Sequence, residues 1–103
     1  MSLARALHTV SVADAAAVTA VASTAASVTL LAANANRIGV LIANDDANLL
    51  YLKYGATASA TDYTVPIPGN SAYWEMPEPI YRGVIDGIWA ANGSGSARIT
   101  ELT

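Results

Sequence analysis

The chain has 103 residues, the length of one ordinary domain, and 53% of them are apolar while only 13% are charged. Soluble domains usually carry about 25% charged residues, so few side chains are left here to solvate the exterior. We therefore expect other protein to cover part of the surface, either copies of this chain or a larger assembly. The net charge is −3 and the five basic residues are scattered, which argues against nucleic acid as a partner. Cysteine is absent, which excludes disulfides, thiolate catalysis and cysteine–zinc sites.

Residues 1–26 are predicted to form an Ala-rich N-terminal arm. Alanine favours a helix, but the Ser, Thr and Val residues between Ala13 and Ala26 lower that preference. We interpret this segment as an extended or partly ordered arm, with one short helix as the alternative. The arm either becomes ordered on a neighbouring subunit or is a terminus without a role in assembly.

The stretch over residues 15–33 carries no charge and is long enough to cross a bilayer. It consists mostly of Ala, Ser and Thr, so its transfer into lipid is weakly favoured at best. The N-terminus also lacks the basic cluster and the leucine-rich run of a signal peptide. We therefore predict no membrane partner.

Residues 27–103 are predicted to form one β-domain, because short apolar runs alternate there with turn residues. The run from Arg37 to Ala43 has apolar residues at both odd and even positions, which indicates a strand covered on both faces. A turn is expected over residues 44–48, where Asn and Asp tolerate turn conformations. Pro66 indicates an edge strand, and Pro68-Gly69 suits the centre of a type II turn. The predicted strands cover residues 27–31, 37–43, 49–54, 63–67, 72–76, 84–89 and 97–101.

The segment Asn92-Gly93-Ser94-Gly95 is typical of a hairpin turn between the last two strands. It is not a phosphate-binding loop, because the lysine and the following helix are missing. About seven short strands with no helical period after residue 26 predict an all-β fold. We expect an antiparallel β-sandwich or barrel, jelly-roll-like, that follows the N-terminal arm.

The sequence offers four weak candidates for chemistry, and none is assigned a catalytic, cofactor-binding or metal-binding role. His8, the single histidine, lies in the arm, where a solvated side chain is the better interpretation. Asp45-Asp46 could bind calcium, but the loop lacks the alternating ligands and the closing Glu of a calcium loop, so a solvated turn is favoured.

The other two candidates are also carboxylates. Glu75 and Glu78 bracket a proline and could be viewed as a carboxylate pair, but they are expected to face water. Asp86 lies within an apolar strand and is expected to pair with Arg82 or Arg98 in the sheet. We therefore expect a protein that is not an enzyme and that carries no cofactor.

A family resemblance rests on segments at the ends of strands and in turns. They are residues 30–37, 42–45, 50–55, Pro68-Gly69, 73–75, 81–83, 85–89 and 97–101. In their spacing these segments resemble a group of small virion proteins of tailed bacteriophages, often encoded near the capsid genes. The resemblance covers residues 27–103 and does not include the arm.

This resemblance implies a structural, non-enzymatic component of the virion. The role that it favours is a capsid decoration or cement protein, which binds the phage head lattice and stabilises it. Such proteins are commonly β-rich and often trimeric. The implied partners are the major capsid protein and further copies of the chain, with a trimer favoured. The implied location is the capsid surface, after synthesis in the cytoplasm of the bacterial host.

Three other roles stay open. One is a head-fibre or spike base, or a tail or connector component of the same virion. Another is a carbohydrate- or receptor-binding module, in which Trp74 and Trp89 would stack on sugar rings, although both lie in strand patterns that predict burial. A small enzyme is the third, and it has no candidate catalytic set.

Overall fold

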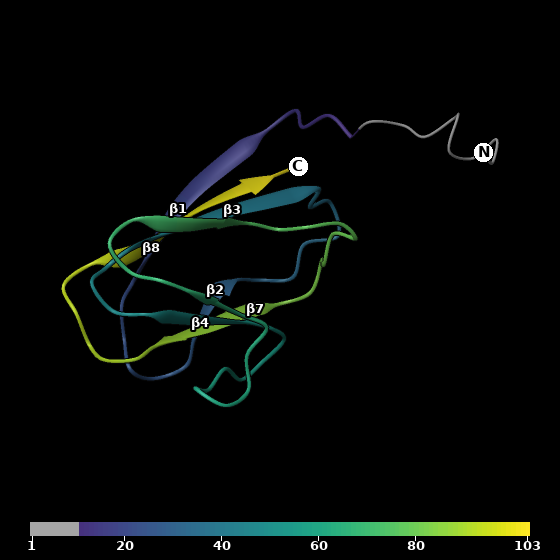
Figure 1. The fold of residues 1–103 in the computed structure, drawn as a ribbon. Helices are drawn as coiled ribbons and strands as arrows, with labels where there is room; N and C mark the ends of the chain where they lie inside the picture. The colour runs from purple at the N-terminus through teal and green to yellow at the C-terminus, as the bar shows by residue number, and fades with distance from the viewer. Residues whose placement is uncertain (1–10) are drawn as a thin grey trace, which may run out of the picture.

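The computed structural model describes residues 11–103, which form two four-stranded sheets that face each other (Figure 1). One sheet has the strand order β1-β8-β3-β6, and the other has the order β2-β7-β4-β5. All strand pairings within these two sheets are antiparallel. The strands are β1 (Ala16–Ala22), β2 (Val28–Leu31), β3 (Gly39–Asp45), β4 (Leu50–Tyr54), β5 (Val65–Ile67), β6 (Ala72–Glu75), β7 (Ile85–Trp89) and β8 (Ser96–Leu102).

This strand order is that of a jelly roll. Successive strands lie in opposite sheets, so the chain crosses the sandwich after nearly every strand, and only β4 and β5 are consecutive neighbours. The predicted all-β sandwich of jelly-roll type is therefore confirmed. The two sheets stay open and do not close into the barrel that was the alternative, and the described residues contain eight strands.

Alternating side chains from both sheets fill the space between them. In β3, Val40 and Ile42 point inward and are buried, whereas Leu41 between them points outward and is 39% exposed. The outer face of β3 is therefore open, and the prediction that both of its faces are covered was wrong. The remaining core residues with little exposure are Leu30, Leu50, Leu52, Ile67, Met76, Ile85, Trp89, Ala97 and Ile99.

β1 lies where the sequence predicted an arm or a short helix. It pairs with β8 along its whole length, from Ala16 opposite Leu102 to Ala22 opposite Ser96. The prediction was therefore wrong for residues 16–22, and the sandwich begins before residue 27. Val and Thr favour extended backbone, and the ladder with β8 outweighs the helix preference of the alanines. Residues 1–10 of the predicted arm lie outside the described residues.

Two predicted turns also differ from the structure. β7 and β8 belong to different sheets, so residues 90–95 form a crossing loop and not the predicted hairpin. Positive φ angles occur at Asn70 (62°) and Ser71 (73°) and not at Gly69, so the predicted type II turn centred on Pro68-Gly69 was wrong. Pro66 does lie in an edge strand, β5, as predicted.

The crossings place four loops at one end of the sandwich, at the left in Figure 1. These loops connect β1 to β2, β3 to β4, β5 to β6, and β7 to β8. They bond to one another: the Trp89 N–H donates to the Thr24 carbonyl at 2.9 Å, and the Ala25 N–H donates to Asn92 Oδ1 at 2.7 Å. This loop end carries the first candidate site.

Candidate functional site

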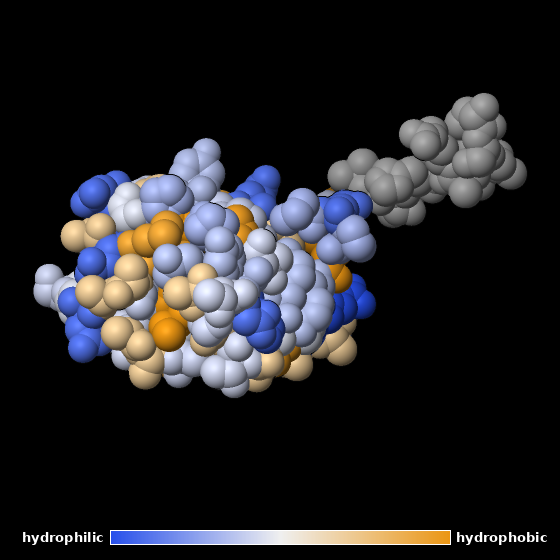
Figure 2. Space-filling model, turned by 60° about the horizontal axis from the view of Figure 1, so that its bottom comes forward, coloured by the Kyte–Doolittle hydropathy of each residue, from blue (hydrophilic) through white to orange (hydrophobic). Residues whose placement is uncertain are grey.

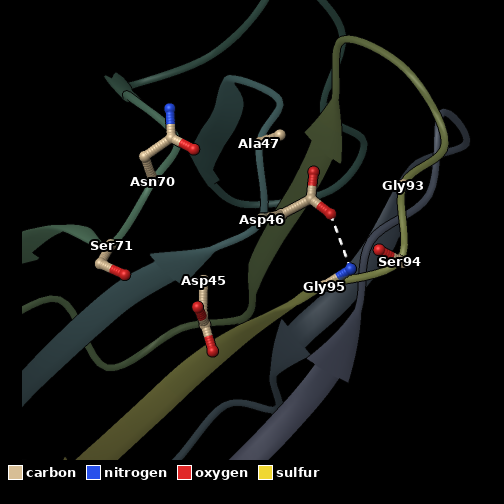
Figure 3. Close-up of a pocket in the computed structure, with 8 residues that line it drawn as sticks. All are labelled: Asp45, Asp46, Ala47, Asn70, Ser71, Gly93, Ser94 and Gly95. Atoms are coloured by element: carbon tan, nitrogen blue, oxygen red, sulfur yellow. Dashed lines mark hydrogen bonds between the residues drawn. The ribbon is translucent and has the colours of Figure 1, made fainter.

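The loop end contains a shallow polar hollow, shown in Figure 3. Its walls come from three loops that are distant in the sequence. The lining residues are Asp45, Asp46, Ala47, Asn70, Ser71, Gly93, Ser94 and Gly95. Two carboxylates on one side of a hollow make this the natural place to look for a bound cation.

Asp46 uses its carboxylate to join the loops. It accepts hydrogen bonds from the Asn48 N–H at 2.9 Å, the Asn48 side-chain amide at 3.0 Å and the Gly95 N–H at 2.8 Å. The bond from the Asn48 backbone is the main cause that lowers the pKa of Asp46 below 3.8, although burial opposes it. The Ser23 hydroxyl faces the same carboxylate and also lowers this pKa, but it lacks regular hydrogen-bond geometry with any described residue. Asp46 is therefore a structural anchor, and the prediction that it lies in a solvated turn was wrong.

Asp45 points away from Asp46 in Figure 3. Its carboxylate lies 3.5 Å from the guanidinium of Arg98, and both side chains are more than half exposed. Among residues 11–103, no group of three or more His, Cys, Asp or Glu side chains is placed to hold a metal ion. The two aspartates thus act separately, one within the fold and one at the surface.

Asn44 directly precedes Asp45 at the end of β3 and is completely buried, although the sequence analysis placed it in a turn. Its amide nitrogen donates to the carbonyls of Asn48 at 2.8 Å and Ile67 at 3.0 Å, with a longer bond to Pro68. Its Oδ1 accepts from Trp89 Nε1 at 3.0 Å. Every polar atom of this side chain therefore has a partner, which is the condition for burying it without a large cost. Asn44 holds the loop end in one conformation.

A second buried polar residue, Arg37, organises the opposite end of the sandwich. Its Nε donates to Glu101 at 2.8 Å, and its two terminal nitrogens donate to the carbonyls of Ala32, Tyr81 and Gly83. Arg37 is fully buried and Glu101 is 14% exposed. The ion pair therefore ties β8 to the loops over residues 32–37 and 81–83, and the sequence analysis missed it.

The other predicted carboxylates do not form a reactive group. Glu75 and Glu78 are both exposed, as expected. Asp86 is 6% exposed and accepts a hydrogen bond from Thr29 Oγ1 at 3.0 Å. The predicted pairing of Asp86 with Arg82 or Arg98 was wrong, because Arg82 donates to the Arg37 carbonyl and Arg98 lies beside Asp45. His8 lies outside the described residues.

The two tryptophans do not offer an exposed platform for a sugar. Trp89 is 1% exposed, and Trp74 is half-buried with its ring 6.1 Å from that of Tyr54. Tyr54 stacks in turn on Tyr81, with ring centroids 4.6 Å apart and planes within 3°. These aromatic side chains pack against the core, so a role of Trp74 and Trp89 in sugar stacking finds no support in their positions.

The outer face of the β1-β8-β3-β6 sheet is the second candidate site. Tyr73 is 72% exposed, Val18 70% and Leu41 39%, and all three side chains project from this face. Near Leu41 the surface is hollowed, with Gly39, Leu102 and Ile80 among the lining residues. Polar residues share this face, since Thr100 lies opposite Val18 and Leu41, and Arg98 and Glu75 are exposed on it. Exposed apolar side chains gathered on one face of a sheet are typical of a protein contact.

The opposite side of the molecule is formed by the β2-β7-β4-β5 sheet and its loops. Figure 2 shows the side on which β2, β4 and β7 lie in Figure 1, where pale residues surround several orange, apolar patches and several deep-blue, hydrophilic ones. Here the loop over residues 55–64 folds back toward the sheet. Lys53 reaches Asp62 and the Thr57 carbonyl, and Ser27 Oγ accepts from the Ala58 N–H. This sheet therefore already has part of its outer face covered.

Comparisons with known proteins add no relatives: no protein-family model, no curated protein and no solved structure matches this chain. Residues 11–103 include no helix that is long and apolar enough to span a membrane. The site with the most capacity for recognition is thus a surface, the outer face of one sheet together with its β1 edge.

Proposed function

We propose that this protein is a non-enzymatic structural component of a tailed-bacteriophage virion, and that it acts as a decoration or cement protein on the head. The single observation that carries the proposal is the open face of the β1-β8-β3-β6 sheet, with Val18, Leu41 and Tyr73 exposed. The resemblance of residues 27–103 to small phage virion proteins supports the same role. The low charge, 13% of residues, also suits a molecule whose surface is covered in an assembly.

A cement protein stabilises a lattice by burying surface on several capsid subunits at once. Each contact can be weak, because contacts made by one rigid body add through multivalency. The sandwich suits this task, since the loops at both ends are tied down by Asn44, Asp46 and Arg37. A rigid domain transmits the load between the subunits that it bridges.

Binding to purified heads tests the proposal. Heads of the phage that encodes this protein, prepared without it, should bind the purified protein until a fixed number of copies per capsid subunit is reached. The variant Tyr73→Lys, at an exposed position of the open face, should lower the affinity, whereas Ala91→Lys in the exposed crossing loop should not. No binding at micromolar protein would contradict the proposal.

The number of occupied sites separates this role from its neighbours. A head-fibre base, a spike base or a connector component would saturate at one vertex or a few sites per particle. A carbohydrate-binding module would bind glycans without heads. Either result would replace the decoration role.

A further inference from the structure

β1 is the least protected strand of the sandwich. It is the last strand of its sheet, so within residues 11–103 its outer edge has no partner strand. The side chains of residues 16–20 are all exposed, including those on the inward side, and only Val21 is half-buried against the core. β1 is therefore held in place mainly by its ladder with β8.

The backbone hydrogen bonds show which groups of β1 face this free edge. Ala15 and Thr103 exchange two N–H···O bonds of 3.0 Å, and the Ser23 N–H donates to the Gly95 carbonyl. Residues that face the partner alternate with residues that face away in an antiparallel ladder, so the odd-numbered residues of β1 bond to β8. The N–H and C=O groups that point to the free edge belong to Ala16, Val18, Ala20 and Ala22.

The other three sheet edges carry features that discourage further pairing, and β1 does not. β5 has three residues, one of them Pro66, and β2 has four residues with a register shift between Thr29 and Leu31. β6 has four residues and is followed at once by Met76-Pro77. β1 has seven residues in continuous register, with no charge and no proline. Such an edge is a template for another strand.

We propose that β1 pairs antiparallel with β1 of a second copy, about a two-fold axis at Thr19. This register sets Val18 opposite Ala20 of the partner subunit and Ala16 opposite Ala22 of the partner subunit. All four residues whose backbone groups point to the free edge then exchange N–H···O hydrogen bonds with the partner strand. A shift of the axis to residue 18 or 20 would leave the backbone groups of one end residue outside the paired strand. The β1-β8-β3-β6 sheets of the two copies would then form one continuous sheet of eight strands.

The side chains fit this arrangement. Thr19 faces Thr19 of the partner subunit at a non-hydrogen-bonded position, where side chains are closest and threonine pairs are favourable. No charge repels its copy, because residues 16–22 carry none. The contact is isologous, so it closes at two copies and does not produce the trimer that the resemblance favours. The inference does not depend on the proposed function.

The contact is small, since each copy contributes one strand and ordinary interfaces involve about 20–30 residues a side. We therefore expect a weak dimer, because small interfaces of this kind bind weakly. Sedimentation velocity of the full chain at concentrations up to about 100 µM measures it. The observed mass should rise from that of one 10.6 kDa chain towards twice that value. A chain that stays monomeric over this range overturns the proposal, as does a trimer.

Charge complementation at Thr19 tests the register. Thr19→Lys and Thr19→Asp, at an exposed position, should each weaken dimerisation at least tenfold, because two like charges would face each other. An equimolar mixture of the two variants should restore dimers. Circular dichroism and thermal unfolding check that both variants are folded. Dimers that persist in the separate variants, or that fail to return in the mixture, contradict this register.

A disulfide trap gives a second, independent measurement. The chain has no cysteine, so Thr19→Cys introduces a single thiol. Facing cysteines at a non-hydrogen-bonded pair have the short separation that a disulfide needs. Mild oxidation should crosslink Thr19→Cys much faster than the control Tyr73→Cys, whose site is exposed on β6. Equal crosslinking rates in the two variants would refute the pairing at Thr19.

Discussion

Arg37 and Asn44 determine the local order of the two ends of the molecule, and both are buried polar residues with every contact made inside the fold. Arg37 bonds to one carboxylate and three carbonyls, and Asn44 bonds to three carbonyls and one indole N–H. Groups of this kind specify one arrangement of the loops, because any other arrangement leaves a buried polar atom without a partner.

Replacing Arg37 should therefore be costly. Arg37→Met keeps much of the side-chain volume but removes the positive charge beside Glu101, which keeps only the hydrogen bond from Asn34, and leaves three carbonyls without the Arg37 donor. We expect a loss of about 3–5 kcal/mol in the free energy of unfolding. Urea unfolding at 25 °C measures it. The control Arg98→Met removes the more exposed pair with Asp45 and should cost less than about 1 kcal/mol. Equal effects of the two substitutions would show that burial does not determine how much the Arg37–Glu101 pair contributes to the free energy of unfolding.

Asp46 makes the stability depend on pH in the acid range. Hydrogen bonds hold its pKa in the folded protein below the ordinary value of 3.8, so the folded state favours the charged form. Its contribution is present above pH 3.8 and is lost as the pH falls through the lower pKa of the folded state.

Comparison of the wild type with Asp46→Asn over pH 2–7 tests this assignment. The variant should be less stable than the wild type at neutral pH, and the difference should shrink toward pH 2. The exposed Asp14 provides the control, because Asp14→Asn at the surface should leave the free energy of unfolding at neutral pH nearly unchanged. A difference between wild type and Asp46→Asn that stays constant with pH would contradict the role of the Asp46 charge.

At the scale of elements, β1 differs from the other strands because its backbone ladder, and not its side chains, holds it. Its odd-numbered residues bond to β8 and its even-numbered residues face the free edge. Two adjacent proline substitutions separate these roles, since proline removes one N–H.

Thr19→Pro should destabilise the fold by about 1–3 kcal/mol, because it leaves a carbonyl of β8 without its donor. Val18→Pro removes an outward N–H and should cost about 1 kcal/mol or less, as proline is tolerated at the solvent side of an edge strand. Urea unfolding at low protein concentration measures both variants without a contribution from dimers. The reverse order of the two effects would show that the even-numbered residues of β1, and not the odd-numbered ones, bond to β8.

The strands that could be predicted from the sequence are those with large apolar residues between turn residues. β3 and β4 are runs rich in large apolar and aromatic residues, β8 alternates apolar residues with polar ones, and turn residues bound all three. β1 was missed because alanines make its two faces alike and most of its surface stays exposed. The sheet order was not predictable in detail either, because a crossing loop such as residues 90–95 has the same local composition as a hairpin.

The polar anchors escaped prediction for a related reason. A charged residue before an apolar run, like Arg37, indicates surface unless its partner is known, and Glu101 is 64 residues away. Asn44 and Asp46 lie in a run rich in Asn and Asp that is typical of a turn, and only the tertiary contacts with Trp89 and Gly95 show that they are buried. Long-range partners of this kind leave no mark in the local pattern.

At the scale of the whole molecule, the sandwich presents one partly covered side and one open side. The loop over residues 55–64 folds against the β2-β7-β4-β5 sheet, whereas the β1-β8-β3-β6 sheet exposes Val18, Leu41 and Tyr73. The open side ends in the free edge of β1. This asymmetry is the physical basis for proposing that the protein works by contact with other proteins on a lattice.

Cryo-electron microscopy of phage heads tests that proposal most directly. Heads that lack this protein would be imaged before and after the purified chain is added, and the difference in density would be computed. The account predicts additional density of one sandwich at every equivalent lattice position, with the β1-β8-β3-β6 sheet towards the capsid subunits. Identical heads, or additional density at a single vertex, would contradict it.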